Sequence, residues 1–146
     1  MGLGNRRKRQ WIRVGFFVYL GWLLYITLLG RKAGYDAAGA VWSGWLVTHQ
    51  NGVWNWDALG NILMFAPYTL LMYLGFPKAA GKRPVARAMM LSLIFSVFIE
   101  CTQLVTTRGT FQVADLAYNT LSGGAGALVY LRVSRKASAS SDDREI

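Results

Sequence analysis

The chain has 146 residues, of which 53% are hydrophobic, and it carries a formal net charge of +9. Its hydrophobic residues come in blocks of about 15 to 20, close to the roughly 20 that a helix needs to cross a bilayer core, which excludes an ordinary soluble domain. The single cysteine excludes an internal disulfide and a cysteine-based zinc site.

In a soluble chain this positive charge would indicate a nucleic-acid partner. Here the basic residues gather in three clusters, and only Arg31, Lys32 and Arg108 lie outside them. The clusters are Arg6, Arg7, Lys8, Arg9 and Arg13, then Lys78, Lys82, Arg83 and Arg87, and finally Arg132, Arg135, Lys136 and Arg144. Membrane topology explains this pattern, so we expect no nucleic-acid partner.

Residues 1–10 form a basic lead, and residues 11–29 form the first predicted span. A cleaved signal peptide has a similar pattern, but this apolar core is longer and Arg31-Lys32 follows it directly, so we predict an uncleaved helix. The connection 31–56 holds four of the six tryptophans, which are typical of membrane interfaces. Residues 37–47 could form a short helix on the membrane surface or an irregular loop.

Three further spans are predicted, at residues 58–76, 88–105 and 115–133. Pro67 should kink the second span unless its neighbours compensate. The small residues from Ser122 to Ala127 favour close packing of the fourth span. The Ser-rich, charged residues 134–146 predict a disordered tail. The expected fold class is therefore all-α, a bundle of four transmembrane helices.

Four spans place both termini on one side of the membrane, and the positive-inside rule puts the three basic clusters in the cytoplasm. The Trp-rich connection and the loop containing Arg108 then face outward. The outer ends of the second, third and fourth spans each carry an acid and an amide at helical spacing. These pairs are Asp57 with Asn61, Glu100 with Gln103, and Asp115 with Asn119.

Two of these pairs share the pattern D-x-x-x-N-x-L, which begins at Asp57 and again at Asp115, 58 residues later. That separation is the length of one two-helix unit. The chain could therefore be a duplicated helical hairpin.

Structural roles account for part of this polar set. Asp57 and Asp115 stand where helix N-caps stand, each worth about 1 kcal/mol. The asparagines could form interhelical hydrogen bonds worth roughly 0.6 kcal/mol each. Neither role explains Glu100, whose charge would meet the unfavourable end of its helix dipole, and Arg108 is the nearest cation to pair with it. A polar pocket and an ion-pair network both remain open.

These residues resemble the motifs of the VanZ-like family of bacterial membrane proteins. The resemblance covers about residues 55–130 and rests on Asp57-x3-Asn61 leading into Phe65-Ala66-Pro67-Tyr68, on Ser96-x3-Glu100-x2-Gln103, on Arg108, and on Asp115-x3-Asn119-x3-Gly123. The family's usual glycine after the proline is replaced here by Tyr68 and Thr69. The resemblance implies a small multi-helix protein of the bacterial plasma membrane. It also implies a cell-envelope role, because the founding member is associated with resistance to the glycopeptide antibiotic teicoplanin.

Three classes of function follow. The first is a pocket for the head group of an amphiphile, such as a lipid-linked cell-wall intermediate or a lipoglycopeptide. Its ligand-binding residues would be Asp57, Asn61, Glu100, Gln103, Arg108, Asp115 and Asn119. Arg108 would meet a phosphate or carboxylate, and the amides would meet sugar or peptide groups.

The second class is a membrane-embedded enzyme with Glu100 as general acid or base, in which Asp57 and Asp115 could hold a divalent cation. No nucleophile–base pair, histidine cluster or cofactor loop supports it, so we expect no resident metal and no cofactor. The third class is a structural subunit, whose small-residue face would serve an oligomer or another membrane partner. In every case membrane lipids are expected partners.

Overall fold

The computed structural model describes the backbone of residues 3–29, 42, 45, 56–109 and 111–142, and the side chains of residues 6–29, 42, 45, 59–109 and 111–137. Its elements are α1 (Leu3–Leu24), the π-helical turn η1 (Tyr25–Leu29), α2 (Trp56–Gly75), the 3-10 turn η3 (Pro77–Ala79), α3 (Pro84–Val105) and α4 (Val113–Asp142). The described residues contain no β-strand. The all-α fold class is confirmed for this part of the chain.

The four long helices coincide with the four predicted spans, but α1 and α4 are longer. α1 begins at Leu3, within the basic lead, and α4 continues to Asp142, through most of the tail predicted to be disordered. Both extensions are rich in Arg, Lys, Ser or Ala and contain no proline that would stop a helix already nucleated by packing. The predicted surface helix at 37–47 lies outside the described residues, apart from Trp42 and Trp45.

Two helices are long and apolar enough to cross a membrane by length and composition, Arg6–Leu29 and Pro84–Val105, and Leu59–Gly75 is a shorter apolar helix. α3 gives a stronger argument for a membrane environment, because it buries polar side chains and exposes large apolar ones, the reverse of a helix in a soluble protein. Its buried face holds Ser92, Ser96, Glu100 and Gln103. Its large exposed side chains are Met90, Leu93, Ile94, Val97, Phe98, Leu104 and Val105. A helix that is polar inside and apolar outside fits an apolar solvent.

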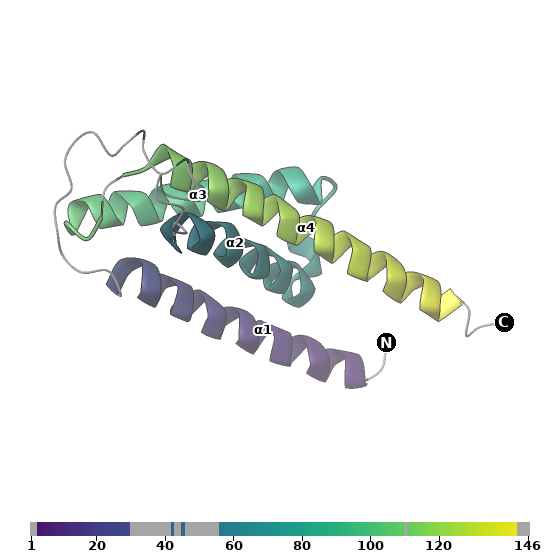
Figure 1. Ribbon diagram of the computed structural model, residues 1–146. Helices are drawn as coiled ribbons and strands as arrows, with labels where there is room; N and C mark the ends of the chain where they lie inside the picture. The colour runs from purple at the N-terminus through teal and green to yellow at the C-terminus, as the bar shows by residue number, and fades with distance from the viewer. Residues whose placement is uncertain (1–2, 30–41, 43–44, 46–55, 110, 143–146) are drawn as a thin grey trace.

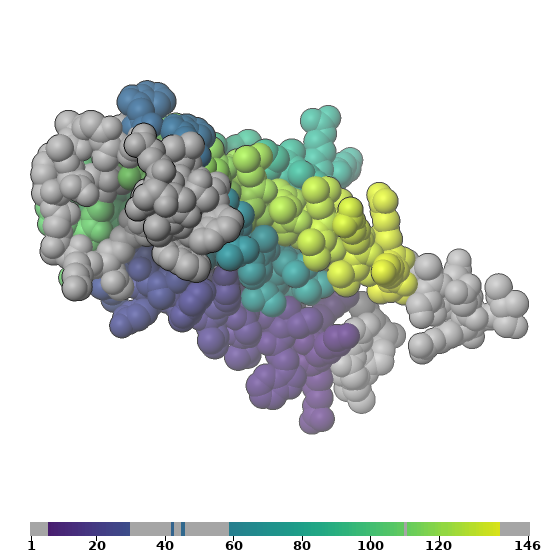
Figure 2. Space-filling model, in the orientation of Figure 1, coloured from purple at the N-terminus to yellow at the C-terminus, as the bar shows by residue number. Residues whose placement is uncertain are grey.

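α4 is the central element, since it packs along both α2 and α3, whereas the backbones of α2 and α3 lie farther apart and meet through large side chains such as the stacked rings of Tyr68 and Phe95. α1 packs on the other side of α2 (Figures 1 and 2). The start of α1 and the end of α4 lie at the same end of the bundle (Figure 1). The apolar core has one cluster around Tyr73 and a second around Phe65.

Two glycines allow α4 to approach its neighbours. A Cβ on Gly126 would overlap the carbonyl oxygen of Ala66 on α2, and a Cβ on Gly123 would overlap the Ser92 side chain on α3. The predicted role of the small residues in close packing is thus confirmed within the chain. Because these two positions already face α2 and α3, they are not free to form an oligomer contact.

α2 runs through Pro67 without ending. A proline cannot donate to the carbonyl four residues earlier, here that of Leu63. Hydroxyl groups from two other helices bind the adjoining carbonyls: Ser122 donates to that of Ile62, and Tyr19 donates to that of Met64 at 2.9 Å. Neighbouring helices therefore bind the backbone on both sides of the freed carbonyl and tie α2 to α1 and α4 at the proline.

Arg13 joins the opposite end of α2 to α1. Its Nε donates to the carbonyl of Gly75, the last residue of α2, at 3.0 Å, and its guanidinium lies 5.0 Å from the ring centroid of Phe76. A cation is favourable at this position because the final carbonyls of a helix lack partners and carry the negative end of the dipole.

Candidate functional site

The end of the bundle where α4 begins, which the sequence predicts to face outward and which we call the outer end, holds two buried carboxylates. Glu100 on α3 is 2% exposed, and its Oε2 accepts a hydrogen bond of 2.9 Å from the backbone N–H of Gln112. Gln112 directly precedes the first residue of α4. Glu100 is therefore at the unfavourable end of its own helix and at the favourable, positive end of the next one.

Asp115, the second carboxylate, is 3% exposed and is the third residue of α4. It lies in the first turn, and not at the N-cap position that the sequence suggested. A negative charge in a first turn is still favourable. Glu100 and Asp115 thus gather at the start of a single helix, although they come from two helices.

A buried pair lies one turn deeper. Asn119 Nδ2 on α4 donates to Ser96 Oγ on α3 at 2.8 Å, and the two residues are 3% and 0% exposed. Ser96 is four residues before Glu100, and Asn119 is four residues after Asp115, so each lies on the same helix face as its carboxylate. This hydrogen bond connects the two helices below the carboxylates.

A third level lies around Gly123. A Cβ on this glycine would overlap Ser92 Oγ and lie 3.3 Å from Thr69 Oγ1, so hydroxyl groups from α3 and α2 meet at α4. Ser92 and Thr69 are both 0% exposed. From Glu100 to Ser92 the polar side chains extend about 12 Å along α3 at about 1.5 Å per residue. We call this set the polar track: Glu100, Asp115, Ser96, Asn119, Ser92 and Thr69.

Several polar atoms in and beside the polar track have no hydrogen-bond partner among the described protein atoms. They are Asn61 Nδ2, Thr69 Oγ1, Ser92 Oγ, Gln103 Oε1, Asn119 Oδ1 and Thr120 Oγ1. A buried polar group without a partner costs about 1–3 kcal/mol, and native structures contain few of them. Polar groups of this kind suit a site that exchanges hydrogen bonds with hydroxyl, amide or ammonium groups.

The remaining polar residues of this end contact α1. Gln103, 1% exposed, donates through Nε2 to the Thr27 carbonyl at 2.8 Å. Arg108 donates through Nη1 to the Leu29 carbonyl at 3.2 Å. Both acceptors belong to η1, so these two side chains hold the end of the first helix. The predicted ion pair between Glu100 and Arg108 stays a prediction.

Arg108 follows a turn of unusual backbone conformation. Two hydrogen bonds end α3, from Arg108 N to Gln103 O at 3.0 Å and from Thr107 N to Leu104 O at 3.3 Å. This is the pattern of a Schellman motif, whose left-handed position is normally glycine. Thr107 occupies it with φ 53°. A β-branched residue there is strained, and strain of this kind is concentrated at functional sites.

The sequence-predicted residues from α2 are only partly described. Asp57 is the second residue of α2, and its side chain lies outside the described residues. Asn61 is buried, as its counterpart Asn119 is. The leucines two positions later, Leu63 and Leu121, are 67% and 63% exposed. The asparagine of the repeated D-x-x-x-N-x-L pattern is thus buried, and its leucine exposed, in both copies.

Sequence reasoning did not include Ser92, Ser96 or Thr69 among the predicted ligand-binding residues. The spacing of Ser92, Ser96 and Glu100, each four residues apart, was a usable signal, because it marks one face of an otherwise apolar helix. Among the described residues, no group of three or more His, Cys, Asp or Glu side chains could hold a metal ion. The divalent cation suggested for Asp57 and Asp115, and catalysis by Glu100, stay predictions.

A polar interior enclosed by apolar outer faces defines a helical membrane protein. Residues 16–134 match the VanZ/LLP1 family model, which covers most of the chain, so the protein belongs to the VanZ-like family. The match includes every residue of the polar track and extends beyond residues 55–130, where the motifs lie. No curated protein and no solved structure matches the chain.

Proposed function

We propose that the chain is a multi-pass protein of the bacterial plasma membrane, with four spans and both termini in the cytoplasm. The basic clusters and both helix ends at one end of the bundle support this topology under the positive-inside rule (Figure 1). At 20 residues, α2 has a length of about 30 Å, which is the thickness of the hydrocarbon core. The polar track then lies toward the outer face.

Within this topology, the outer end binds the head group of a membrane-bound amphiphile. The observation that carries this proposal is the burial of Glu100 and Asp115 above a line of side chains with unpartnered polar atoms. Ionisable groups within membrane segments are rare and mark functional sites by default. An acyl chain of the same ligand would lie against the apolar outer faces of the helices.

The charges of the site narrow the ligand class. Two carboxylates attract ammonium groups and accept from hydroxyl and amide groups, but they repel a bare phosphate. Arg108, in contact with η1 at the rim, is the cation available to a carboxylate or phosphate. This combination favours a sugar- or peptide-bearing head group, as in a lipoglycopeptide or a lipid-linked cell-wall intermediate. Family membership supports a role related to glycopeptide resistance.

The test is the teicoplanin susceptibility of bacteria that express the full chain. Expression of the wild-type protein should lower susceptibility, and Glu100→Gln and Arg108→Ala should abolish that protection while membrane levels stay normal. Arg135→Ala is the matched control, since it removes an exposed arginine far from the site in sequence and should leave protection intact. Variants that protect like wild type would contradict the proposal, as would a loss of protection that only follows loss of the protein.

A further inference from the structure

The basic end of the bundle has a groove of about 340 Å³ between α1 and α4. Both helices pack on α2, and Leu74, the next-to-last residue of α2, contributes to the lining between them. The groove is lined by Lys8, Arg9, Ile12, Leu74, Pro77, Tyr130, Val133, Ser134 and Ala137. It is separate from the polar track, and only its placement in the cytoplasmic leaflet rests on the proposed topology.

The lining has a charged part and an apolar part. Lys8 and Arg9 supply two cations from the first turns of α1, while Ile12 and Leu74 supply aliphatic surface. α4 contributes residues 130, 133, 134 and 137, whose spacing places them on one helix face toward the groove. Tyr130 is held in place by an edge-on ring contact with Tyr73, with centroids 5.3 Å apart.

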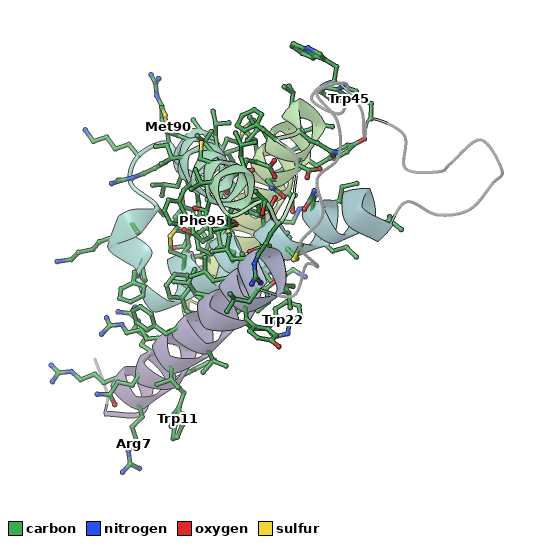
Figure 3. The ribbon with its side chains drawn as sticks, turned by 90° about the vertical axis from the view of Figure 1, so that its left-hand side faces the viewer. Arg7, Trp11, Trp22, Trp45, Met90 and Phe95 are labelled. Atoms are coloured by element: carbon green, nitrogen blue, oxygen red, sulfur yellow. The ribbon has the colours of Figure 1, made fainter. Side chains whose placement is uncertain are left out.

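The charge at this end is unbalanced among the described side chains. The only acidic side chains that the structure describes, Glu100 and Asp115, belong to the opposite end of the bundle. Arg7 and Trp11, on another face of α1 at the same end, point away from the bundle (Figure 3). Trp11 is 74% exposed, and an exposed tryptophan next to basic residues is typical of a membrane interface.

We propose that this groove is a binding site for an anionic phospholipid of the cytoplasmic leaflet. Lys8 and Arg9 bind the phosphate, and an acyl chain lies along Ile12, Leu74 and Val133. Basic pockets between helices on the cytoplasmic side bind anionic lipid head groups. The aliphatic wall favours a phospholipid over a free phosphate, since inorganic phosphate gains nothing from apolar surface.

The experiment measures lipid binding to the full chain in neutral detergent by native mass spectrometry. The probes are phosphatidylglycerol and phosphatidylcholine, with glycerol 3-phosphate as a competitor that lacks acyl chains. Wild type should prefer phosphatidylglycerol by about thirty-fold, since each basic residue near a membrane surface contributes about five-fold. Glycerol 3-phosphate should not displace the bound lipid.

Two pairs of variants locate the site. Lys8→Gln with Arg9→Gln should remove the preference for phosphatidylglycerol, whereas Lys82→Gln with Arg83→Gln removes the same charge from an exposed loop and should leave it unchanged. Val133→Trp should fill the groove and weaken binding of both lipids. Its control is Val129→Trp, which changes an exposed valine one turn away that does not line the groove.

Three results would overturn the proposal. The first is equal binding of the two lipids by wild type. The second is an equal loss of preference in both charge variants, which indicates general attraction to the basic surface. The third is displacement by glycerol 3-phosphate, which indicates a phosphate site without an acyl subsite. A thermal melt of each variant in detergent identifies any variant that fails to fold. If the double charge variant fails to fold, Val133→Trp decides, and if Val133→Trp fails, the double charge variant decides.

Discussion

The two ends of the bundle treat charge in opposite ways. At the outer end the carboxylates of Glu100 and Asp115 are 2% and 3% exposed and lie at the start of α4. At the basic end Lys8 is exposed on α1, beside a groove that opens to the surroundings. The carboxylates at the outer end are stabilised by contacts within the fold, whereas the basic side chains are stabilised by solvent or by lipid head groups. Loss of a buried contact at the outer end should therefore lower the stability of the fold, and loss of charge at the basic end should affect lipid preference.

The contrast has a physical origin in α4. Its first turns supply unpaired backbone N–H groups and a positive dipole end, which stabilise buried anions. Farther along, the described part of α4 carries the exposed basic residues Arg132, Arg135 and Lys136, which keep their charged ends in water. A single helix thus connects a buried polar interior to a basic surface.

The largest expected effect comes from separating α4 from α2. Gly126→Ala should lower the free energy of unfolding by about 2–3 kcal/mol, because the new methyl group would overlap the backbone carbonyl of Ala66 and backbone cannot move aside cheaply. A titration with sodium dodecyl sulfate, which unfolds the protein, measures this change in the free energy of unfolding. The control is Gly15→Ala on α1, whose Cβ meets nothing within 4 Å and should cost nothing. Equal losses in both variants would show that α4 does not depend on this contact.

The next largest effect is expected from the hydrogen bond between Asn119 on α4 and Ser96 on α3. Ser96→Ala should destabilise the protein by about 1–3 kcal/mol, because it leaves the buried amide of Asn119 without its acceptor. A double-mutant cycle with Asn119→Leu should give a coupling of roughly 0.6–1.7 kcal/mol, from the average to the maximum found between membrane helices. A coupling of zero would contradict the hydrogen bond.

A stabilising change is expected at the turn after α3. Thr107→Gly should raise the free energy of unfolding by about 1 kcal/mol, because glycine adopts the left-handed conformation without strain. Thr106→Gly, at φ −87°, has no such strain to release and should not stabilise. If both substitutions destabilise the protein to the same extent, Thr107 is not strained.

The smallest effect should come from the basic end. Lys8→Gln with Arg9→Gln should change the free energy of unfolding in neutral detergent by less than about 0.5 kcal/mol, as is usual for surface substitutions. The same titration measures it, with Ser96→Ala as the reference for a buried change. A loss as large as that of Ser96→Ala would remove the distinction between the two ends.

The sequence predicted the helices because their apolar blocks are long and are separated by Gly, Pro and basic residues. It also found the polar set, since Glu100 and Asp115 stand out in apolar surroundings. It did not predict that Glu100 would contact the start of α4, because that depends on how two helices pack. For the same reason it did not predict that Gln103 and Arg108 would donate hydrogen bonds to carbonyls of η1.

Two further differences have local causes. Ser92 and Thr69 were not predicted as site residues because a hydroxyl in an apolar helix can bind its own backbone, and composition does not reveal whether it faces a neighbour. The helical part of the tail was not predicted because its polar composition resembles disorder, while α4 extends into it from a packed segment. In both cases tertiary contact outweighs local composition.

The most direct test of the outer site is a binding measurement with the full chain in lipid nanodiscs. Isothermal titration calorimetry with teicoplanin should give saturable binding, and removal of the acyl chain from the antibiotic should weaken it. Glu100→Gln retains the size of the side chain and an acceptor for the Gln112 N–H but removes the charge. It should weaken binding by roughly ten- to hundred-fold, the worth of a hydrogen bond to a charged group. Binding that is unchanged in Glu100→Gln would contradict the assignment of the buried carboxylate end as the ligand site.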